Sequence, residues 1–340
     1  MTAIGFDAGT YNLVCARRGK EDKIAYKREV NAFLEMPLGN KFVFNMMKKA
    51  GVPLVEYPDQ DIAYALGESA VDMAYTMTQI ELRRPMIHGC LNPRERNAQQ
   101  IMSIMAHSLI EDAQPGDTVF YSVPANAINE ETDADYHGKV LQAIFKAAED
   151  EDGNSLGLDV YPINEGLALV YAELAEKSWT GLGVSCGAGM INVCFAIFGA
   201  PVFQFSLVNS GDWIDKMASK AIGEETTSYV NKEKMKTDLT IENPTELVQR
   251  AIKAQYELMI ERTVSGIKKG LADAGKKART DKPIDIIISG GTSSPKGFPE
   301  LFREIVAKSN LPIDVGRIVR PTDPLYSVAR GCLIAAENAK

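Results

Sequence analysis

The stretch that decides the fold lies near the middle of the chain and reads GVSCGAGMINV, residues 183–193. Two apolar runs flank three small residues, Gly187, Ala188 and Gly189, and this pattern predicts two strands joined by a tight turn. Backbone N–H groups in such a turn point outward and form a concave site for phosphate oxygens. The stretch therefore predicts a hairpin that grips phosphate.

A second hairpin of this kind opens the chain in FDAGTYN, residues 6–12. Asp7 precedes its turn, where a carboxylate can hold the water molecules of a bound Mg²⁺, and Thr10 offers a hydroxyl group. Taken alone, the motif also fits a plain hairpin with a polar tip. Its recurrence in the second half, together with strand-to-helix units in both halves, indicates a duplicated α/β core with a cleft between two lobes.

The bulk composition excludes several classes of protein. The 340 residues are 45% hydrophobic and 24% charged, as in ordinary globular proteins of two lobes. A net charge of -8 and a pI of about 5.2 argue against nucleic acid as a partner, because duplex binding requires clustered Lys and Arg. No apolar run reaches the roughly 20 residues of a membrane span. We find no signal peptide or amphipathic leader, so we expect a cytoplasmic protein without direct membrane insertion.

The cysteines and histidines offer no metal site. No C-x-x-C pair occurs, and the cysteines lie far apart or within apolar runs, which predicts reduced core residues. They are Cys15, Cys90, Cys186, Cys194 and Cys332. His88, His107 and His137 are scattered along the chain.

Several further motifs follow in a fixed order. They include V-P before an acidic helix, INEGLALVYAEL (163–174), SGDWID (210–215), ISGGT (288–292) and DPLYSVARG (323–331). With the two hairpins, this order resembles the actin and Hsp70 superfamily of nucleotide-binding proteins over nearly the whole chain. Within that superfamily the chain is most similar to bacterial actin-like proteins of the MreB and MamK type, which GESAVDM and RRPMIHG favour over Hsp70.

The resemblance implies a duplicated actin-like (ribonuclease H-like) two-lobe ATPase fold with a central nucleotide cleft. We expect lobe I over residues 1–158, with a small subdomain inserted at about 32–78. Lobe II would cover 159–324, with a small subdomain at about 206–275. A C-terminal helix in 325–340 would return to lobe I.

The same resemblance implies binding of ATP or ADP with Mg²⁺. The first hairpin would hold the β- and γ-phosphates, with Asp7 near the metal through water, and the second hairpin would close over them from lobe II. The implied nucleotide contacts are Asp7, Gly9, Thr10, Tyr11, Asn12, Gly187, Ala188, Gly189, Gly211, Asp212, Glu233, Lys236, Gly290, Gly291 and Thr292. For Glu233 and Lys236 a solvated helix face remains an equal alternative.

Hydrolysis requires a water molecule placed in line with the terminal phosphate. Glu131 matches the carboxylate that serves MreB-type proteins, while Glu130 and Asp133 are close alternatives, and any of them could simply complement the helix N-terminus. The second hairpin departs from the family pattern, because Ser185 replaces a carboxylate and Met190 and Ile191 replace two hydroxyl residues. We therefore expect backbone-mediated nucleotide binding to survive and ATP hydrolysis to be weakened.

Three classes of function follow from the resemblance. The first is an actin-like ATPase that polymerises head-to-tail into cytoskeletal filaments, with itself as partner and with any adaptor or cargo undetermined. The alternatives are an Hsp70-like chaperone or reactivating ATPase without a substrate domain, and a small-molecule kinase of the same superfamily.

Overall fold

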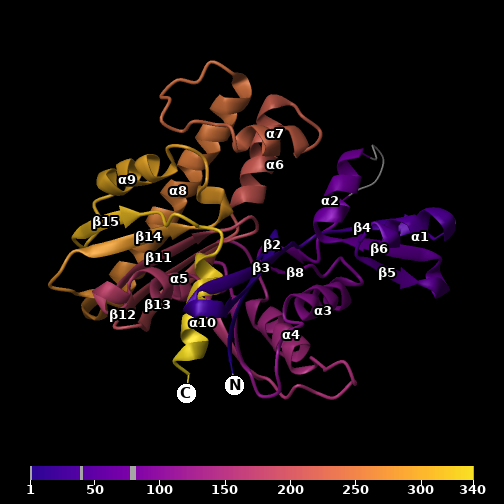
Figure 1. Cartoon of the computed structure of the whole chain (residues 1–340). Coiled ribbons are helices and arrows are strands. Elements are labelled where there is room, and N and C mark those ends of the chain that lie inside the picture. Colours follow the sequence, from indigo (N-terminus) through magenta and orange to yellow (C-terminus); the bar gives the residue numbers. More distant parts are fainter. Residues whose placement is uncertain (1, 39–40, 77–81, 340) are drawn as a thin grey trace.

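The computed structural model describes residues 2–38, 41–76 and 82–339 (Figure 1). Two five-stranded mixed sheets form its framework. The first has the order β10-β9-β1-β2-β3, and the second has the order β13-β12-β11-β14-β15. We call the first sheet and its helices lobe I, and the second sheet and its helices lobe II.

The two sheets follow one plan. In each sheet, the first three strands in the chain form an antiparallel meander. On its other side, the first of these strands pairs in parallel with a later strand: β1 with β9 in lobe I, and β11 with β14 in lobe II. The lobe I strands are β1 (Ala3–Ala8), β2 (Asn12–Arg18), β3 (Ile24–Val30), β9 (Thr118–Val123) and β10 (Asp159–Asn164). The lobe II strands are β11 (Gly181–Cys186), β12 (Ile191–Ile197), β13 (Ala200–Leu207), β14 (Ile284–Ser289) and β15 (Val315–Val319). This repetition confirms the predicted duplicated α/β fold.

Two helices join the sheets. Helix α5 (Glu165–Glu173) packs on β11 and β12 of lobe II, and α10 (Ser327–Glu337) packs on β1 and β9 of lobe I. The two helices contact each other near the centre of the molecule (Figure 1). Their approach is close enough that a Cβ on Gly331 would lie 1.8 Å from the carbonyl oxygen of Ala168. The C-terminal helix thus packs on the sheet of lobe I.

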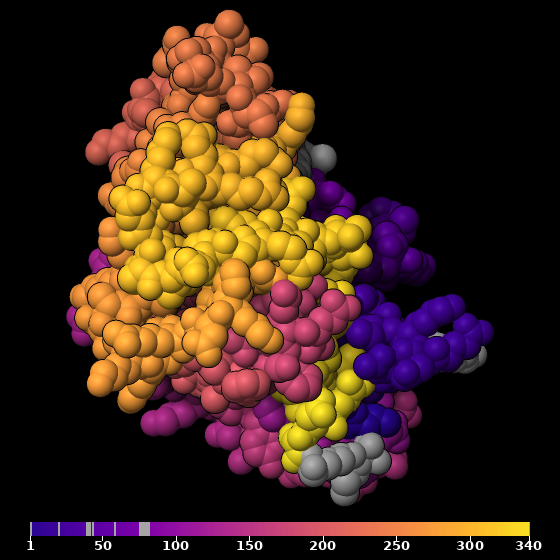
Figure 2. Space-filling model, turned by 90° about the vertical axis from the view of Figure 1, so that its left-hand side faces the viewer, coloured from indigo at the N-terminus to yellow at the C-terminus, as the bar shows by residue number. Residues whose placement is uncertain are grey.

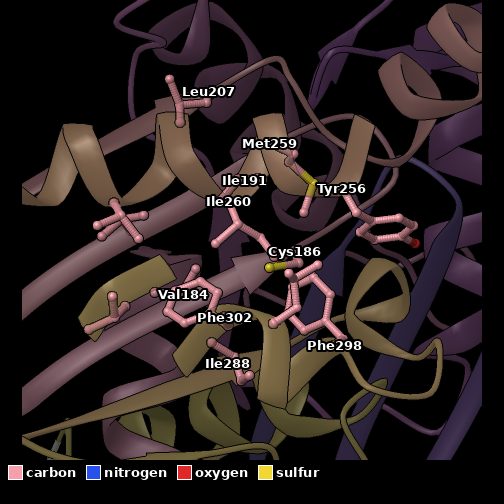
Figure 3. Close-up of a cluster of buried hydrophobic side chains, with 14 of the residues drawn as sticks. Val184, Cys186, Ile191, Leu207, Tyr256, Met259, Ile260, Ile288, Phe298 and Phe302 are labelled. Atoms are coloured by element: carbon pink, nitrogen blue, oxygen red, sulfur yellow. The ribbon is translucent and has the colours of Figure 1, made fainter. Parts of the chain in front are cut away.

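The remaining helices cover the outer faces. Helices α3 (Ala98–Leu109) and α4 (Ala134–Lys146) belong to lobe I, and α6 (Gly211–Ile222), α7 (Ser228–Lys234), α8 (Leu247–Ala274) and α9 (Phe298–Lys308) belong to lobe II. Figure 3 shows the lobe II core, where Tyr256, Met259 and Ile260 of α8 face the sheet and Phe298 and Phe302 of α9 lie close by. Strands β11 and β14 are buried along their whole length, because helices cover both faces.

A small three-stranded sheet is inserted into lobe I. It has the order β4-β6-β5, from Phe33–Pro37, Ile62–Leu66 and Leu54–Tyr57, and carries α1 (Lys41–Lys49) and α2 (Gly67–Thr76). A two-stranded ribbon, β7 (Met86–Ile87) and β8 (Cys90–Leu91), follows it. Residues 39–40 and 77–78 of the expected insertion lie outside the described residues.

The expected lobe boundary after residue 158 falls just before β10. Strand β10 pairs in parallel with β9 of lobe I, with Asp159 opposite Thr118 and Asn164 opposite Val123. We propose that the boundary lies after Asn164, where α5 begins and the chain crosses to the second sheet.

All five cysteines are free and buried, as predicted for reduced core residues. Among the described residues, no helix combines the length and the apolar character that a membrane span needs.

Candidate functional site

The two predicted hairpin turns lie against each other. A Cβ atom on Gly189 would stand 2.3 Å from the hydroxyl oxygen of Thr10 and 2.7 Å from the backbone nitrogen of Gly89. The N–H of Gly89, in the turn between β7 and β8, donates to the Thr10 hydroxyl at 3.2 Å. The fold thus brings the turn after Asp7 into contact with the turn at residues 187–189, although most of lobe I lies between them in the sequence.

The second turn is also fixed to the start of α6. Gly187 accepts hydrogen bonds at its carbonyl from the Thr292 hydroxyl (2.7 Å) and from the N–H of Gly211 (3.2 Å). Ala188 accepts one from the N–H of Asp212 at 2.8 Å. Gly187, Ala188, Gly211, Asp212 and Thr292, all predicted from sequence, therefore form one cluster.

The predicted glycines at the end of β14 differ in what surrounds them. Gly290 has a left-handed φ of 91°, and a Cβ there would lie 2.4 Å from the carbonyl oxygen of Cys186, so only glycine fits. A Cβ on Gly291 would meet no protein atom within 4 Å. The face of Gly291 is therefore open to a ligand.

Two carboxyl groups meet beneath the turns. Asp7, at the end of β1, accepts a hydrogen bond from Ser122 at 2.8 Å, and Glu165, at the start of α5, accepts one from Ser185 at 3.0 Å. Burial raises the pKa of Asp7 above its ordinary range. Burial and the neighbouring Asp7 carboxyl raise the pKa of Glu165. Asn192 also bonds to Glu165, and no ion pair between described residues involves either carboxyl, so the protein offers no cation to compensate their charge when they ionise.

This donor set fits a nucleotide-bound Mg²⁺. Magnesium is held through one or two carboxylates together with water and substrate phosphates, so two acidic side chains suffice. No group of three or more potential metal ligands of the Asp, Glu, His and Cys types occurs in the described part of the chain. The oxygen Oδ1 of Asn12 and the nitrogen Nδ2 of Asn164 are buried without a hydrogen-bond partner. These atoms provide further polar groups for a hydrated ion or a phosphate.

Comparison with known protein families identifies the family of this chain. The family model described as Volactin matches residues 1–336. The chain belongs to the Volactin family. No curated protein matches the sequence significantly.

Solved structures share the fold of this Volactin-family chain. A MamK double helical filament superposes with a TM-score of 0.70 at 16% identity, covering 99% of both chains. MreB 5 of Spiroplasma citri bound to AMPPNP gives 0.66 at 13% identity, covering 96% of this chain and 93% of MreB. A non-polymerising MamK variant bound to AMPPNP gives 0.61 at 17% identity, covering 98% of each. The predicted resemblance to MreB- and MamK-type actin-like proteins is confirmed.

Glu165 was absent from the sequence-based prediction. Within INEGLALVYAEL it follows Asn164, whose side chain caps α5 by accepting hydrogen bonds from the N–H groups of Gly166 (2.9 Å) and Leu167 (3.3 Å). An acidic residue there resembles an ordinary complement of the helix dipole. The available signal was a carboxylate at the head of a helix whose next five residues are glycine or apolar. Only the tertiary fold places it beside Asp7 in the Volactin-family chain.

Ser185, which replaces the carboxylate of the family pattern, has a structural role. Its hydroxyl donates to Glu165, whereas a carboxylate at this position would add a third acidic group beside Asp7 and Glu165. Met190, the other substitution, is buried and packs across the lobes, because a Cβ on Gly89 would lie 2.6 Å from its sulfur. Apolar packing thus replaces a hydroxyl at this contact.

The three candidate hydrolytic carboxylates occupy different surroundings. Helix α4 begins at Ala134, so Glu130 and Glu131 lie in the preceding loop rather than on the helix. Asp133 caps α4 by accepting a hydrogen bond from the N–H of Tyr136, and Glu130 lies 3.1 Å from His88. Glu131 is exposed. Of the three, Asp133 has a clear structural role.

The other predicted contacts are distributed around the cluster. Lys236 pairs with Glu233 at 2.7 Å, while the neighbouring Lys234 reaches the carbonyl of Gly211 at 3.2 Å. Asp212 lies 3.0 Å from Arg84 of lobe I, so it links the two lobes. In the first hairpin, Gly9 accepts a hydrogen bond from Asn31 at 3.0 Å, and Tyr11 is partly exposed.

Proposed function

We propose that this protein binds ATP or ADP with Mg²⁺ between its lobes and assembles into head-to-tail cytoskeletal filaments that turn over by slow ATP hydrolysis. The observation that carries the proposal is the meeting of two glycine-rich turns over the partly buried Asp7 and the buried Glu165. Such turns offer N–H groups to phosphate, and the carboxyl pair offers oxygen ligands to its metal. The filament and AMPPNP complexes of MamK and MreB support the assignment.

Each group has a distinct role in this proposal. Asp7 and Glu165 would hold Mg²⁺, directly or through water, and the ion would neutralise charge on the bound phosphates. Thr10, Asn12 and the 187–189 turn would bind phosphate oxygens from opposite lobes. Gly291 would pass beneath the nucleoside, and Glu233 and Lys236 would stand near the base or ribose. Glu131 would position the attacking water.

Assembly would follow from lobe closure, since binding to groups on both lobes favours the conformation in which they meet. A head-to-tail contact is heterologous and does not close into a ring, so it generates filaments. We place the protein in the cytoplasm, where ATP and Mg²⁺ are available.

The experiment uses Gly291→Leu, a substitution for which the protein itself leaves room. The variant is expected to fold normally but to lose ATP affinity by 100-fold or more, because its side chain would occupy the nucleotide space. Sedimentation of the wild type should give a critical concentration that falls when ATP and Mg²⁺ are added, and the variant should not respond.

Gly291→Ala is the matched control, with a smaller group in the same space. Equal ATP affinity in wild type and Gly291→Leu would refute the site. A fixed small oligomer of the wild type at every concentration would refute assembly.

A further inference from the structure

A short segment of lobe I, residues 84–90, crosses onto lobe II beside the two phosphate turns. It runs from Arg84 into the β7–β8 ribbon, whose turn consists of His88 and Gly89. Both turn residues have positive φ values, 49° and 70°, the pattern of a tight two-residue hairpin turn. The tip of the turn lies against residues 187–189 of lobe II, since a Cβ on Gly189 would stand 2.7 Å from the nitrogen of Gly89. We call residues 84–90 the strap.

Met190 supplies an apolar contact with the tip of the strap. Its side chain is buried and approaches Gly89 so closely that an added Cβ there would stand 2.6 Å from the sulfur. Because Gly89 has no side chain, the flexible thioether packs directly on the backbone of the strap. Met190 takes the place of a hydroxyl residue of the family pattern. This chain therefore has an apolar contact between the lobes where that pattern has a polar group.

Arg84 supplies an ion pair at the other end of the strap. Its Nη1 atom lies 3.0 Å from Oδ2 of Asp212 in lobe II, and each of the two side chains is 30% exposed. Asp212 stands in the first turn of α6, where the helix dipole stabilises a carboxylate. Its N–H donates to the carbonyl of Ala188 at 2.8 Å, which ties the ion pair to the phosphate turn. The neighbouring Arg83, by contrast, pairs with carboxylates inside lobe I.

Helices α5 and α10 join the lobes in a different way. Their backbones meet at Gly331 and Ala168, in a contact that has no room for an added Cβ. In Figure 2 the yellow C-terminal helix lies between the indigo chain of lobe I and the magenta-to-pink chain of lobe II. A tightly packed helix pair changes little when lobes rotate, whereas contacts made by two side chains break. Separation of the phosphate turns therefore breaks the contacts of the strap first.

We infer that the strap is a latch: Arg84 and Met190 hold the lobes closed over the bound phosphates, and nucleotide leaves only after their contacts break. This inference rests on the proposed nucleotide site and concerns the rate at which that site releases its ligand. Phosphates held between the turn after Asp7 and the 187–189 turn are released when the turns separate, as beneath other closing elements. Because both contacts join protein groups and neither involves a phosphate, the latch acts on ATP and ADP alike.

The test measures how fast fluorescent ATP and ADP, bound with Mg²⁺, are displaced by excess unlabelled nucleotide. Arg84→Gln should speed release about threefold, the effect of losing a partly exposed ion pair. Met190→Ala should speed it about tenfold or more, because the substitution leaves a cavity against Gly89. The chain with both substitutions should release nucleotide faster than either single variant. Each variant should change the ATP and ADP rates by the same factor.

Conservative substitutions provide the matched controls. Arg84→Lys keeps the positive charge and Met190→Leu keeps the apolar volume, so both should stay within about twofold of the wild type. Arg94→Gln removes an exposed arginine elsewhere in lobe I and should leave the rates unchanged. If the conservative variants release nucleotide as fast as Arg84→Gln and Met190→Ala, the charge and the apolar contact do not hold the latch.

Hydrogen exchange in the nucleotide-free protein gives a second measurement. The N–H of Gly89 donates to the hydroxyl of Thr10, and it should exchange faster in Arg84→Gln and Met190→Ala. Amides of the buried strand β14 should exchange at the wild-type rate, because opening of the latch is local. Faster exchange in β14 as well as at Gly89 would mean that the substitutions weaken the whole fold, and this result contradicts the latch.

The outcomes separate the inference from the proposed function. If the wild type binds fluorescent ATP and both single variants release it at the wild-type rate, the inference is wrong and the proposed nucleotide site stands. If the wild type binds neither ATP nor ADP, the proposed function and the inference both fail.

Discussion

At the scale of single residues, the carboxyl groups of Asp7 and Glu165 are expected to have the largest effect on how stability depends on pH. Asp7 and Glu165 have no basic partner among the residues that the structure describes, so the folded protein keeps protons that an unfolded chain would release. Because the folded-state pKa values are raised, the stabilising effect of protonation is complete below the ordinary values of 3.8 and 4.5. It is lost as pH rises above them. Ionisation of this site therefore opposes folding as the pH rises.

Glu165→Gln should relieve this cost, because the amide fills the same space without charge. Without nucleotide, we expect the variant to be more stable than the wild type at pH 8 by about 1–3 kcal/mol, with little difference near pH 4. Thermal unfolding across this pH range measures the effect. ATP with Mg²⁺ should stabilise the wild type more than the variant.

Glu151→Gln, at an exposed position, is the control and should leave the pH profile unchanged. Parallel stability curves for wild type and Glu165→Gln would mean that the carboxyl pair does not resist ionisation as described.

At the scale of elements, the contact between α5 and α10 connects the lobes. Glycines permit three successive approaches: β1 to α10 at Gly5, α10 to α5 at Gly331, and β11 to α5 at Gly183. At each of them, an added Cβ would stand within 2.2 Å of a backbone oxygen. Gly183 and Gly331 lie in the motifs 183–193 and 323–331, so these motifs also determine how closely the elements pack.

Gly331→Ala should destabilise the protein by about 2–4 kcal/mol. Alanine favours a helix over glycine by about 1 kcal/mol, but here its methyl group would overlap the carbonyl of Ala168, and a backbone atom cannot move aside as a side chain does. Chemical denaturation measures the loss. Gly291→Ala is the matched control in open space, and equal stability of the two variants would contradict the tight contact.

At the scale of the whole molecule, charge is divided unevenly between the halves. Residues 1–158 contain 23 acidic and 15 basic residues, so this half carries the entire net charge of -8, and the remainder is neutral. Within that neutral half, residues 223–246 contain six acidic and three basic residues, and residues 276–282 contain one acidic and four basic residues.

Filament lifetime should depend on Glu131. If this carboxylate positions the attacking water, Glu131→Ala should slow phosphate release by about 100-fold or more, while ATP affinity and assembly remain near those of the wild type. Filaments should then persist instead of turning over. Phosphate release at saturating ATP and equal polymer mass provides the measurement.

Glu130→Ala is the comparison, since Glu130 lies beside His88 in the same loop. Slower release in Glu130→Ala together with unchanged release in Glu131→Ala would transfer the role to Glu130.

The sequence by itself determined the duplicated fold, because alternating strand and helix patterns and glycine-rich turns are local properties of the chain. It also identified Thr10, Gly187, Gly211 and Thr292, which the structure brings into one cluster. It did not identify Glu165, since burial beside Asp7 depends on how β1, α5 and β11 pack. The place of β10 in lobe I and the contact of the strap with lobe II were likewise decided by tertiary structure. Sheet order and the packing of the two lobes bring together residues that no local pattern relates.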